Sequence, residues 1–329
     1  MAKVVRTDRE LELPGVDAAL RAAGHELVLL PDGIAEARLT EEASDAQLIL
    51  MCYTPITRRV IEGARRLTGI VKYGVGIDAI DIAAAQERGI PVVNVPEYAE
   101  ETVAEGAFAL MMALAKNLKK LDKAVSTEGW VWPERRWLAS DLAGKTVGVV
   151  GLGRIGMSFA RMATGLRMRV LSYDPYVAQA THRDLRAMLA ECDFVSIHCV
   201  LNVETRHLIG ERELGAMKPT AYLINVSRGA IVDELALLKT LQKSGLAGAA
   251  LDVYSQEPLA KHGHPLSPLY AMDHVILSPH LTFYTREAMA RLEAGTLERC
   301  REVLEGRPVT VRSRDPRLRS QSRGVRFVD

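Results

Sequence analysis

Three titratable or charged side chains follow apolar, strand-like segments in the second half of the chain. Arg228 lies in LINVSRGAIVDE, Glu257 in ALDVYSQEP, and His280 in LSPHLTFYT. An arginine offers a planar fork of N–H groups to a carboxylate, or to the carboxylate and adjacent carbonyl of a 2-keto acid. A histidine exchanges protons near neutral pH, and a neighbouring carboxylate favours its charged form. This combination suits proton transfer to a substrate that carries a carboxylate.

Each residue also has an ordinary structural interpretation. Arg228 alone could form a surface ion pair, Glu257 could end a strand in a turn, and His280 could be a loop histidine. Their shared placement at the ends of late strands favours a site, because open parallel sheets bind ligands at that edge. By contrast, His262 and His264 in KHGHP have no carboxylate or cysteine at metal-ligand spacing. That segment predicts an exposed loop and no metal site.

A glycine-rich turn follows a valine-rich segment in KTVGVVGLGRIG, residues 145–156. Gly151 permits a tight turn, Gly153 lets the backbone approach a pyrophosphate, and Gly156 allows the following helix to pack closely. The helix amino end then offers N–H groups to phosphates. Asp174, at the end of MRVLSYD, suits the ribose hydroxyls of adenosine and repels a 2′-phosphate. The pattern predicts NAD rather than NADP; a purely structural glycine turn is the alternative.

Alternating strands and helices must position these residues. Predicted helices over 16–23, 43–45, 57–67 and 80–88 alternate with strands in the first hundred residues, a pattern typical of a parallel sheet. The expected strands are Lys3–Arg6, Glu26–Leu30, Leu48–Cys52, Ile70–Lys72 and Pro91–Asn94, then Thr146–Val150, Arg169–Tyr173, Phe194–His198, Tyr222–Asn225, Ala247–Leu251 and Val275–Leu277. The second series predicts a doubly wound dinucleotide-binding sheet.

One domain is therefore predicted to interrupt another. Residues 1–99 and 286–329 would form a substrate domain, and residues 100–285 an NAD-binding domain. Long helices from about Glu101 to Leu121 and from Thr285 to Glu305 would form a hinge. The cleft between the domains is the expected ligand site.

Composition excludes several classes of protein. The net charge of +1 gives no case for nucleic acid. The basic segment RSRDPRLRSQSRGVR is expected to be solvated or bound by another subunit. No apolar run is long enough to span a bilayer, and the start has no secretory signal pattern. Four scattered cysteines suit a reducing compartment, so a cytoplasmic protein is expected.

All three tryptophans lie in one irregular segment, EGWVWPERRWLASDLAG. Aromatic residues concentrated on a connection predict burial against another surface. A homodimer is the favoured interpretation, and packing on the segment's own domain is the alternative.

The chain resembles the D-isomer-specific 2-hydroxyacid dehydrogenases over nearly its whole length. The similarity rests on GVGID at Gly74–Asp78, the GLGRIG turn, NVSRGAIVDE and the His280 segment. It implies an α/β protein of two domains, a Rossmann NAD-binding domain inserted into a flavodoxin-like substrate domain. It also implies an enzyme with NAD as cofactor and with Arg228, Glu257 and His280 as its catalytic residues.

Further roles follow from the same resemblance. The N–H groups of Val75 and Gly76 would bind the substrate carboxylate. Thr102 resembles the position near the nicotinamide phosphate, and Asp252 the residue that orients the carboxamide. Arg154 and Ile155, within the glycine turn, are also expected to contact the cofactor.

Two segments depart from the common family pattern. His198 is followed by Cys-Val-Leu-Asn where the family commonly has x-Pro-Leu-Thr, which removes a backbone constraint near the cofactor. After His280, Leu-Thr-Phe-Tyr-Thr is closer to the D-lactate dehydrogenases, as is NVPEY, which ends at Tyr98.

Four aromatic residues are candidates for the substrate pocket, with core packing as the alternative for each. They are Tyr53, Tyr98, Phe283 and Tyr284. Such a pocket favours a compact acid such as pyruvate, glyoxylate or hydroxypyruvate. A phosphorylated substrate is disfavoured, because no Lys/Arg cluster besides Arg228 adjoins these motifs.

The expected function is NAD-dependent interconversion of a small 2-keto acid and its D-2-hydroxy acid, with His280 as acid and base. An NAD-sensing, corepressor-like binding protein is one alternative. A formate- or phosphite-type dehydrogenase is another, although formate dehydrogenases pair the histidine with glutamine rather than with a residue such as Glu257.

Overall fold

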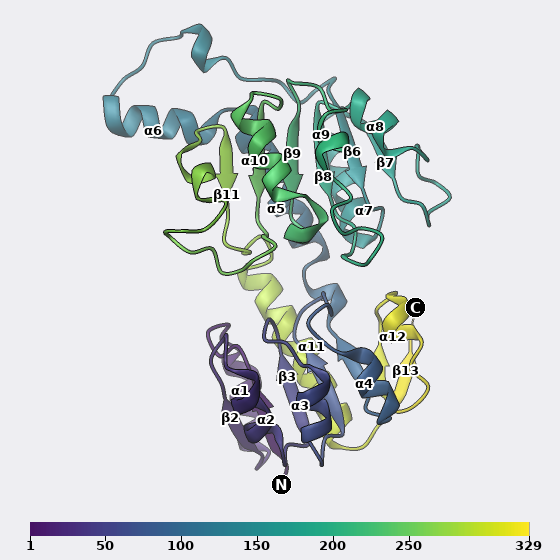
Figure 1. The fold of residues 1–329 in the computed structure, drawn as a ribbon. Helices are drawn as coiled ribbons and strands as arrows, with labels where there is room; N and C mark the ends of the chain where they lie inside the picture. Colours follow the sequence, from purple (N-terminus) through teal and green to yellow (C-terminus); the bar gives the residue numbers. More distant parts are fainter. Residues whose placement is uncertain (329) are drawn as a thin grey trace. The chain divides into compact units, whose positions relative to one another are not determined.

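The computed structural model describes residues 1–328, which form two compact units. Unit 1 comprises Met1–Ala99 with the chain from Thr285 onward, and unit 2 comprises Glu100–Tyr284. Both ends of the chain lie in unit 1 (Figure 1). Within residues 1–328, no helix has the length and apolar character needed to cross a membrane.

Unit 1 is built on a parallel five-stranded sheet of order β2-β1-β3-β4-β5. This is the flavodoxin-like order, and it confirms the expected fold class. The three strands β3, β4 and β5 are wholly buried, as apolar strands covered on both faces should be. The elements are β1 (Lys3–Arg6), α1 (Pro14–Ala22), β2 (Glu26–Leu29), α2 (Glu36–Ala43), β3 (Leu48–Met51), α3 (Arg58–Gly63), β4 (Gly69–Lys72), α4 (Ile82–Glu87), β5 (Val92–Asn94), the 3-10 turn η1 (Pro96–Tyr98) and α11 (Arg286–Leu304).

Unit 2 contains a parallel six-stranded sheet of order β11-β10-β9-β8-β6-β7. Helices α5 and α7 pack on one face, and α8, α9 and α10 cover the other (Figure 1). The elements are α5 (Glu100–Ala115), α6 (Leu118–Glu128), η2 (Arg135–Trp137), β6 (Thr146–Val150), α7 (Arg154–Gly165), β7 (Arg169–Tyr173), α8 (Leu185–Glu191), β8 (Phe194–Ile197), α9 (Glu211–Leu214), β9 (Tyr222–Asn225), η3 (Gly229–Ile231), α10 (Glu234–Gln242), β10 (Gly248–Leu251), η4 (Ser267–Ala271) and β11 (Val275–Leu277).

The sheet of unit 2 reverses its winding between β6 and β8. From β6 the chain adds β7 on one side, and it later adds β8 on the other. Ligands bind at the carboxyl edge where the strand order reverses in this way. Strand β7 lies at the edge of the sheet, whereas the common six-stranded order places a third strand beyond it. The expected strands are all present, with ends that differ by at most one residue.

The predicted helix from Glu101 to Leu121 is wrong in one respect, because it is two helices. Asn117 adopts a left-handed backbone conformation with φ of 53°, which ends one helix before α6 begins. Asparagine tolerates this conformation better than most residues because its side chain can bond locally. Here its amide donates to the carbonyl of Leu138 at 2.8 Å. Similarly, the helix expected over 43–45 is the end of α2.

The basic C-terminal segment is folded onto unit 1 in regular elements, which the expectation of a solvated or subunit-bound tail did not include. It forms β12 (Val309–Val311), α12 (Pro316–Arg319) and β13 (Val325–Phe327). Leu318 is fully buried, and the Gln321 amide bonds both the N–H and the carbonyl of Val92 at 2.7 and 2.9 Å. The Gln321 side chain thus forms hydrogen bonds with the backbone of the edge strand β5, as a neighbouring strand would.

Candidate functional site

His280 and Glu257 form a charged pair at the carboxyl edge of the sheet in unit 2. His280 Nδ1 lies 2.8 Å from Glu257 Oε2, and both side chains are partly exposed. The other carboxylate oxygen of Glu257 accepts the Tyr254 N–H at 2.8 Å. Burial raises the pKa of Glu257, but His280, the Tyr254 N–H and the charge of Arg228 lower it below its ordinary value overall. Glu257 therefore stays ionised beside the imidazole ring of His280.

Arg228 reaches the same edge because two loops touch at a glycine. A Cβ on Gly229 would lie 1.9 Å from the carbonyl carbon of Tyr254, so only glycine fits where η3 meets the loop of Glu257. The amide of Asn225 donates to the Arg228 carbonyl at 2.9 Å and orients the turn. Arg228, Glu257 and His280 thus come from three loops that follow β9, β10 and β11.

Asp252 holds the loop that carries His280. The residue is fully buried; its Oδ1 accepts the Leu281 N–H at 3.0 Å, and its Oδ2 accepts the Thr282 N–H and hydroxyl at 3.2 and 2.6 Å. Its carbonyl accepts the His280 N–H at 2.7 Å. His280 itself has φ of 58°, a conformation that is uncommon outside glycine, and these bonds stabilise it. The carboxamide contact expected for Asp252 stays a prediction; its role in holding this loop was not foreseen.

Phe283 and Tyr284 follow His280 but differ in exposure. Phe283 is buried and meets the His280 ring edge-on, with ring centroids 6.2 Å apart. Tyr284 is half-exposed and packs edge-on against Phe283. Phe283 therefore limits the rotation of the imidazole, a role beyond that of a pocket wall.

The glycine turn has the geometry that a dinucleotide requires. A Cβ on Gly156 would lie 2.0 Å from the Gly151 carbonyl oxygen, and one on Gly151 would lie 2.5 Å from the Cys199 nitrogen. A Cβ on Gly153, in contrast, would meet nothing within 4 Å, so open space faces the start of α7. Gly153 caps α7 without a side-chain hydrogen bond. The turn therefore fits a pyrophosphate next to the helix amino end.

Asp174 joins the glycine turn to the end of β7. Its carboxylate accepts the Leu152 and Tyr176 N–H groups, each at 2.9 Å. This places a negative charge beside the turn, where a ribose would lie. Ile155, in the first turn of α7, is partly buried.

The amino ends of α5 and α7 lie together in unit 2. Arg154 Nη1 pairs with Glu100 Oε1 at 2.8 Å, and Arg161 pairs with Glu101 at 2.7 Å. Thr102, which is buried, therefore lies in the first turn of a helix that begins beside the glycine turn. Arg154 is engaged by Glu100, which the sequence pattern did not indicate.

The loop after β8 is well braced even without the family's proline. The Asn202 side chain accepts the Glu204 and Thr205 N–H groups at 2.9 Å, and the Thr205 hydroxyl donates to the Val200 carbonyl at 2.6 Å. His198, before the loop, is partly buried and bonds the Ser196 hydroxyl at 2.8 Å; burial of its ring lowers its pKa to about 3. Similarly, His264 is buried rather than exposed as expected, and its Nδ1 accepts the Leu266 N–H.

The remaining predicted residues belong to unit 1. Val75 and Gly76 follow β4 in an open loop, and neither N–H has an acceptor within residues 1–328. The Val75 carbonyl accepts the Asn94 amide at 2.6 Å, which fixes the loop. Tyr53 is partly exposed, whereas Tyr98 is buried in η1. Two consecutive N–H groups without acceptors suit a carboxylate.

The chain is similar to known proteins in both sequence and structure. Residues 108–282 match the D-isomer specific 2-hydroxyacid dehydrogenase, NAD binding domain. The chain is 37% identical over 316 residues to D-3-phosphoglycerate dehydrogenase of Synechocystis, which covers 94% of this chain but only 55% of that relative. It is 40% identical over 264 residues to glyoxylate reductase of Korarchaeum cryptofilum, covering 77% of this chain and 78% of the relative. The structure of D-lactate dehydrogenase from Aquifex aeolicus, complexed with NAD and lactic acid, has 29% identity and a TM-score of 0.83, covering 92% and 96% of the two chains.

The Asp252 contacts yield a first prediction. In Asp252→Asn, one carboxylate oxygen becomes an N–H donor, which cannot accept from Leu281 or Thr282. Hydrogen bonds to a charged group are worth about 1.5–3 kcal/mol, so we expect kcat to fall by roughly tenfold or more. NADH affinity, measured by fluorescence titration, should change less than about threefold.

A matched control is Asp184→Asn, which makes the same change at the N-cap of α8, where asparagine also caps well. Its kcat should equal that of the wild type. A large loss of NADH affinity in Asp252→Asn with little change in kcat would instead assign Asp252 to the cofactor.

Proposed function

Because the chain belongs to the D-isomer-specific 2-hydroxyacid dehydrogenase family, we propose that it reduces a small 2-keto acid to its D-2-hydroxy acid and catalyses the reverse reaction. The observation that carries the proposal is the 2.8 Å pair of His280 and Glu257 on the same sheet edge as Arg228. When bound, the cofactor would supply hydride as NADH, or take it up as NAD⁺, at the substrate carbon that bears the oxygen. The glycine turn and Asp174 fit its pyrophosphate and ribose.

The side chains then divide the remaining work. Arg228 binds the substrate carboxylate and polarises the adjacent carbonyl with its guanidinium. Glu257 engages His280 Nδ1, so we assign proton transfer to Nε2. The imidazolium donates its proton to the carbonyl oxygen during reduction and recovers it from the hydroxyl during oxidation. The N–H groups of Val75 and Gly76 bind the carboxylate.

A compact keto acid is the proposed substrate class. The named relatives act on glyoxylate, 3-phosphoglycerate and lactate in turn. Phe283 and Tyr284 beside His280 favour a small side chain on the substrate, such as that of glyoxylate, pyruvate or hydroxypyruvate. Glu257 in place of glutamine argues against formate oxidation.

A panel of keto acids tests this function. Wild-type protein should oxidise NADH with at least one of glyoxylate, pyruvate and hydroxypyruvate. His280→Ala should lose at least about 100-fold in kcat, since it removes the general acid, and should keep its affinity for NADH. An unchanged kcat in His280→Ala would contradict the role of His280.

Two other outcomes separate the alternative functions. If phosphite is oxidised while no keto acid is reduced, the protein is a phosphite-type dehydrogenase. If NADH binds tightly and no substrate in the panel turns over, an NAD-sensing binding protein is favoured.

Asp174 is proposed to select NAD over NADP, because its charge repels a 2′-phosphate. In Asp174→Asn, the ratio of kcat/KM for NADPH to that for NADH should rise by roughly tenfold or more. Asparagine keeps an acceptor for one of the two N–H groups that Asp174 binds. Asp193→Asn is the control; it removes a charge before β8, at the opposite edge of the sheet. An unchanged ratio in Asp174→Asn would refute the selectivity role.

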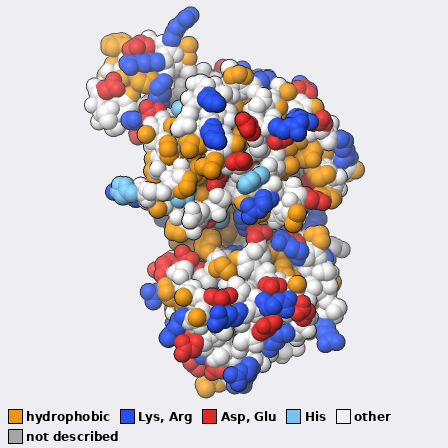
Figure 2. Space-filling model, in the orientation of Figure 1, with side chains coloured by type: hydrophobic (Ala, Val, Ile, Leu, Met, Phe, Trp, Pro, Cys, Tyr) orange, Lys and Arg blue, Asp and Glu red, His pale blue; other side chains and the backbone are white. Residues whose placement is uncertain are grey.

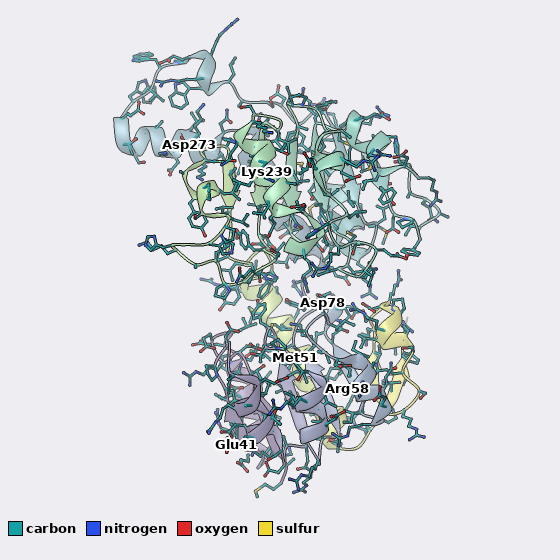
Figure 3. The ribbon with its side chains drawn as sticks, viewed as in Figure 1. Glu41, Met51, Arg58, Asp78, Lys239 and Asp273 are labelled. Atoms are coloured by element: carbon teal, nitrogen blue, oxygen red, sulfur yellow. The ribbon has the colours of Figure 1, made fainter. Side chains whose placement is uncertain are left out.

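We also propose that the aromatic arm, the segment EGWVWPERRWLASDLAG at residues 128–144, contacts a second copy of the chain. Trp130, Trp132 and Leu138 are each more than 70% exposed, and Trp130 meets Trp132 edge-on at 6.3 Å. Hydrophobic side chains gather over this arm, at the upper left of Figure 2. Lys123 of α6, the helix before the arm, pairs with Asp273 at 2.7 Å, which ties α6 to the turn before β11 (Figure 3 labels Asp273). An exposed apolar surface on a well-anchored arm is typical of a subunit interface.

Light scattering after size-exclusion chromatography tests this interface. The wild type should have the mass of two 36.1 kDa chains. Replacing Trp130 and Trp132 with serine should yield monomers, because the apolar area that drives association is lost. Leu235→Ser, at another exposed apolar residue of unit 2, should remain dimeric. A wild type that is monomeric at micromolar concentration would contradict the proposal.

A further inference from the structure

Lys72 is a buried cation with no carboxylate partner among residues 1–328. It is the last residue of β4 and is only 5% exposed. Its Nζ donates to the Cys52 carbonyl, lies 3.2 Å from the Cys52 Sγ, and sits over the Tyr53 ring at 5.4 Å from the centroid. In the described part of the chain, no Asp or Glu oxygen lies within ion-pair distance of it. Met51, labelled in Figure 3, marks the end of the neighbouring strand.

Such an arrangement is unfavourable in a protein without a ligand. Removing an ammonium from water is costly unless an opposite charge is placed nearby. A carbonyl dipole, a thiol and an aromatic face compensate for only part of that loss. A buried lysine of this kind is therefore stabilised when an anion binds next to it.

The adjacent loop is where an anion would bind. A Cβ on Gly74 would lie 3.0 Å from Lys72 Cε and 3.1 Å from its Nζ, so the ammonium lies directly against the loop backbone. The Gly74 carbonyl accepts the Val95 N–H at 3.1 Å, and the Val75 carbonyl is taken by Asn94. The loop's oxygens are thus occupied, while the N–H groups of Val75 and Gly76 have no acceptor among residues 1–328.

We propose that Lys72 is a substrate-affinity residue whose charge attracts the carboxylate bound by the Val75 and Gly76 N–H groups. The inference rests on the proposed function, which assigns the acid's carboxylate to these N–H groups. It adds to Arg228 a second cation next to the motifs, since Lys72 directly precedes YGVGID. The charge acts through space across the loop, at a short distance and away from bulk water, where Coulomb interactions are strongest.

A purely structural role for Lys72 and a role in binding the substrate predict different changes in Tm when the residue is replaced. If Lys72 served only to hold the end of β3 through Cys52, its removal would lower Tm and leave anion affinity unchanged. If it is kept for its charge, replacement by an apolar residue of similar shape should leave Tm unchanged or raise it, because a buried, unpaired charge is lost.

The test uses oxamate, an unreactive carboxylate analogue of a 2-keto acid, titrated calorimetrically into protein saturated with NADH. In Lys72→Met the Kd for oxamate should rise by about tenfold or more, with the Kd for NADH unchanged within about twofold. Lys72→Gln, which keeps a donor for the Cys52 carbonyl but has no charge, should show the same loss of oxamate affinity.

Arg88→Met is the matched control. Arg88 also lies in unit 1 and donates to the backbone carbonyls of Ile61 and Ala64, but it precedes β5, at the opposite edge of the sheet. This variant should lower Tm and leave the Kd for oxamate unchanged.

Two results would overturn the inference about Lys72. One is an unchanged Kd for oxamate in Lys72→Met and Lys72→Gln while the wild type binds oxamate and reduces keto acids; the proposed function then stands. The other is a wild type that binds NADH but neither binds oxamate nor turns over a keto acid, in which case both proposals fail.

Discussion

The hydrogen bonds that Asp252 accepts determine where the imidazole of His280 lies. A single buried carboxylate, together with its own backbone carbonyl, takes up N–H groups from three consecutive residues of the loop. This arrangement keeps His280 in a left-handed backbone conformation that a histidine adopts rarely. The pairing with Glu257 and the edge-on contact with Phe283 both require that conformation. The pair of His280 and Glu257 is thus positioned by a residue that has no exposed surface of its own.

Glycine contacts bring the other components of the site together. Gly229 allows the turn after β9 to touch the backbone of Tyr254, which in turn donates to Glu257. The Tyr254 hydroxyl donates to the carbonyls of Leu251 and Ser278, so it links the ends of β10 and β11. Gly151 and Gly156 serve the same purpose at the cofactor turn, where backbone meets backbone. These glycines matter for the close approaches that they allow, and only Gly153 faces open space where a ligand fits.

Local patterns in the sequence predicted the strands, the glycine turn and the types of residue at the sheet edge. Buried parallel strands have continuous apolar runs, and polar residues first appear at their carboxyl ends, so the apolar pattern places Arg228, Glu257 and His280 after strands. Their catalytic roles are implied by the family resemblance and not by the pattern. Contacts between distant segments could not be predicted in this way. The folding of the basic tail was not foreseen because its composition is polar, yet Leu318 and Gln321 attach it to β5. The helix break at Asn117 depends on a hydrogen bond to Leu138, 21 residues later.

Lys72 shows why charge alone is a poor guide to function in a sequence. A lysine in the last position of a buried strand would ordinarily extend to solvent, and a pattern analysis treats it as the end of the strand. The fold instead encloses it beneath Tyr53 and against Gly74, where it has lost water and gained no carboxylate. Burying an unpaired cation decreases the stability of the ligand-free protein. The fold retains this charge at the end of β4, next to two N–H groups that have no acceptor among residues 1–328. Stability does not require this arrangement, whereas an anionic substrate would satisfy all three groups at once.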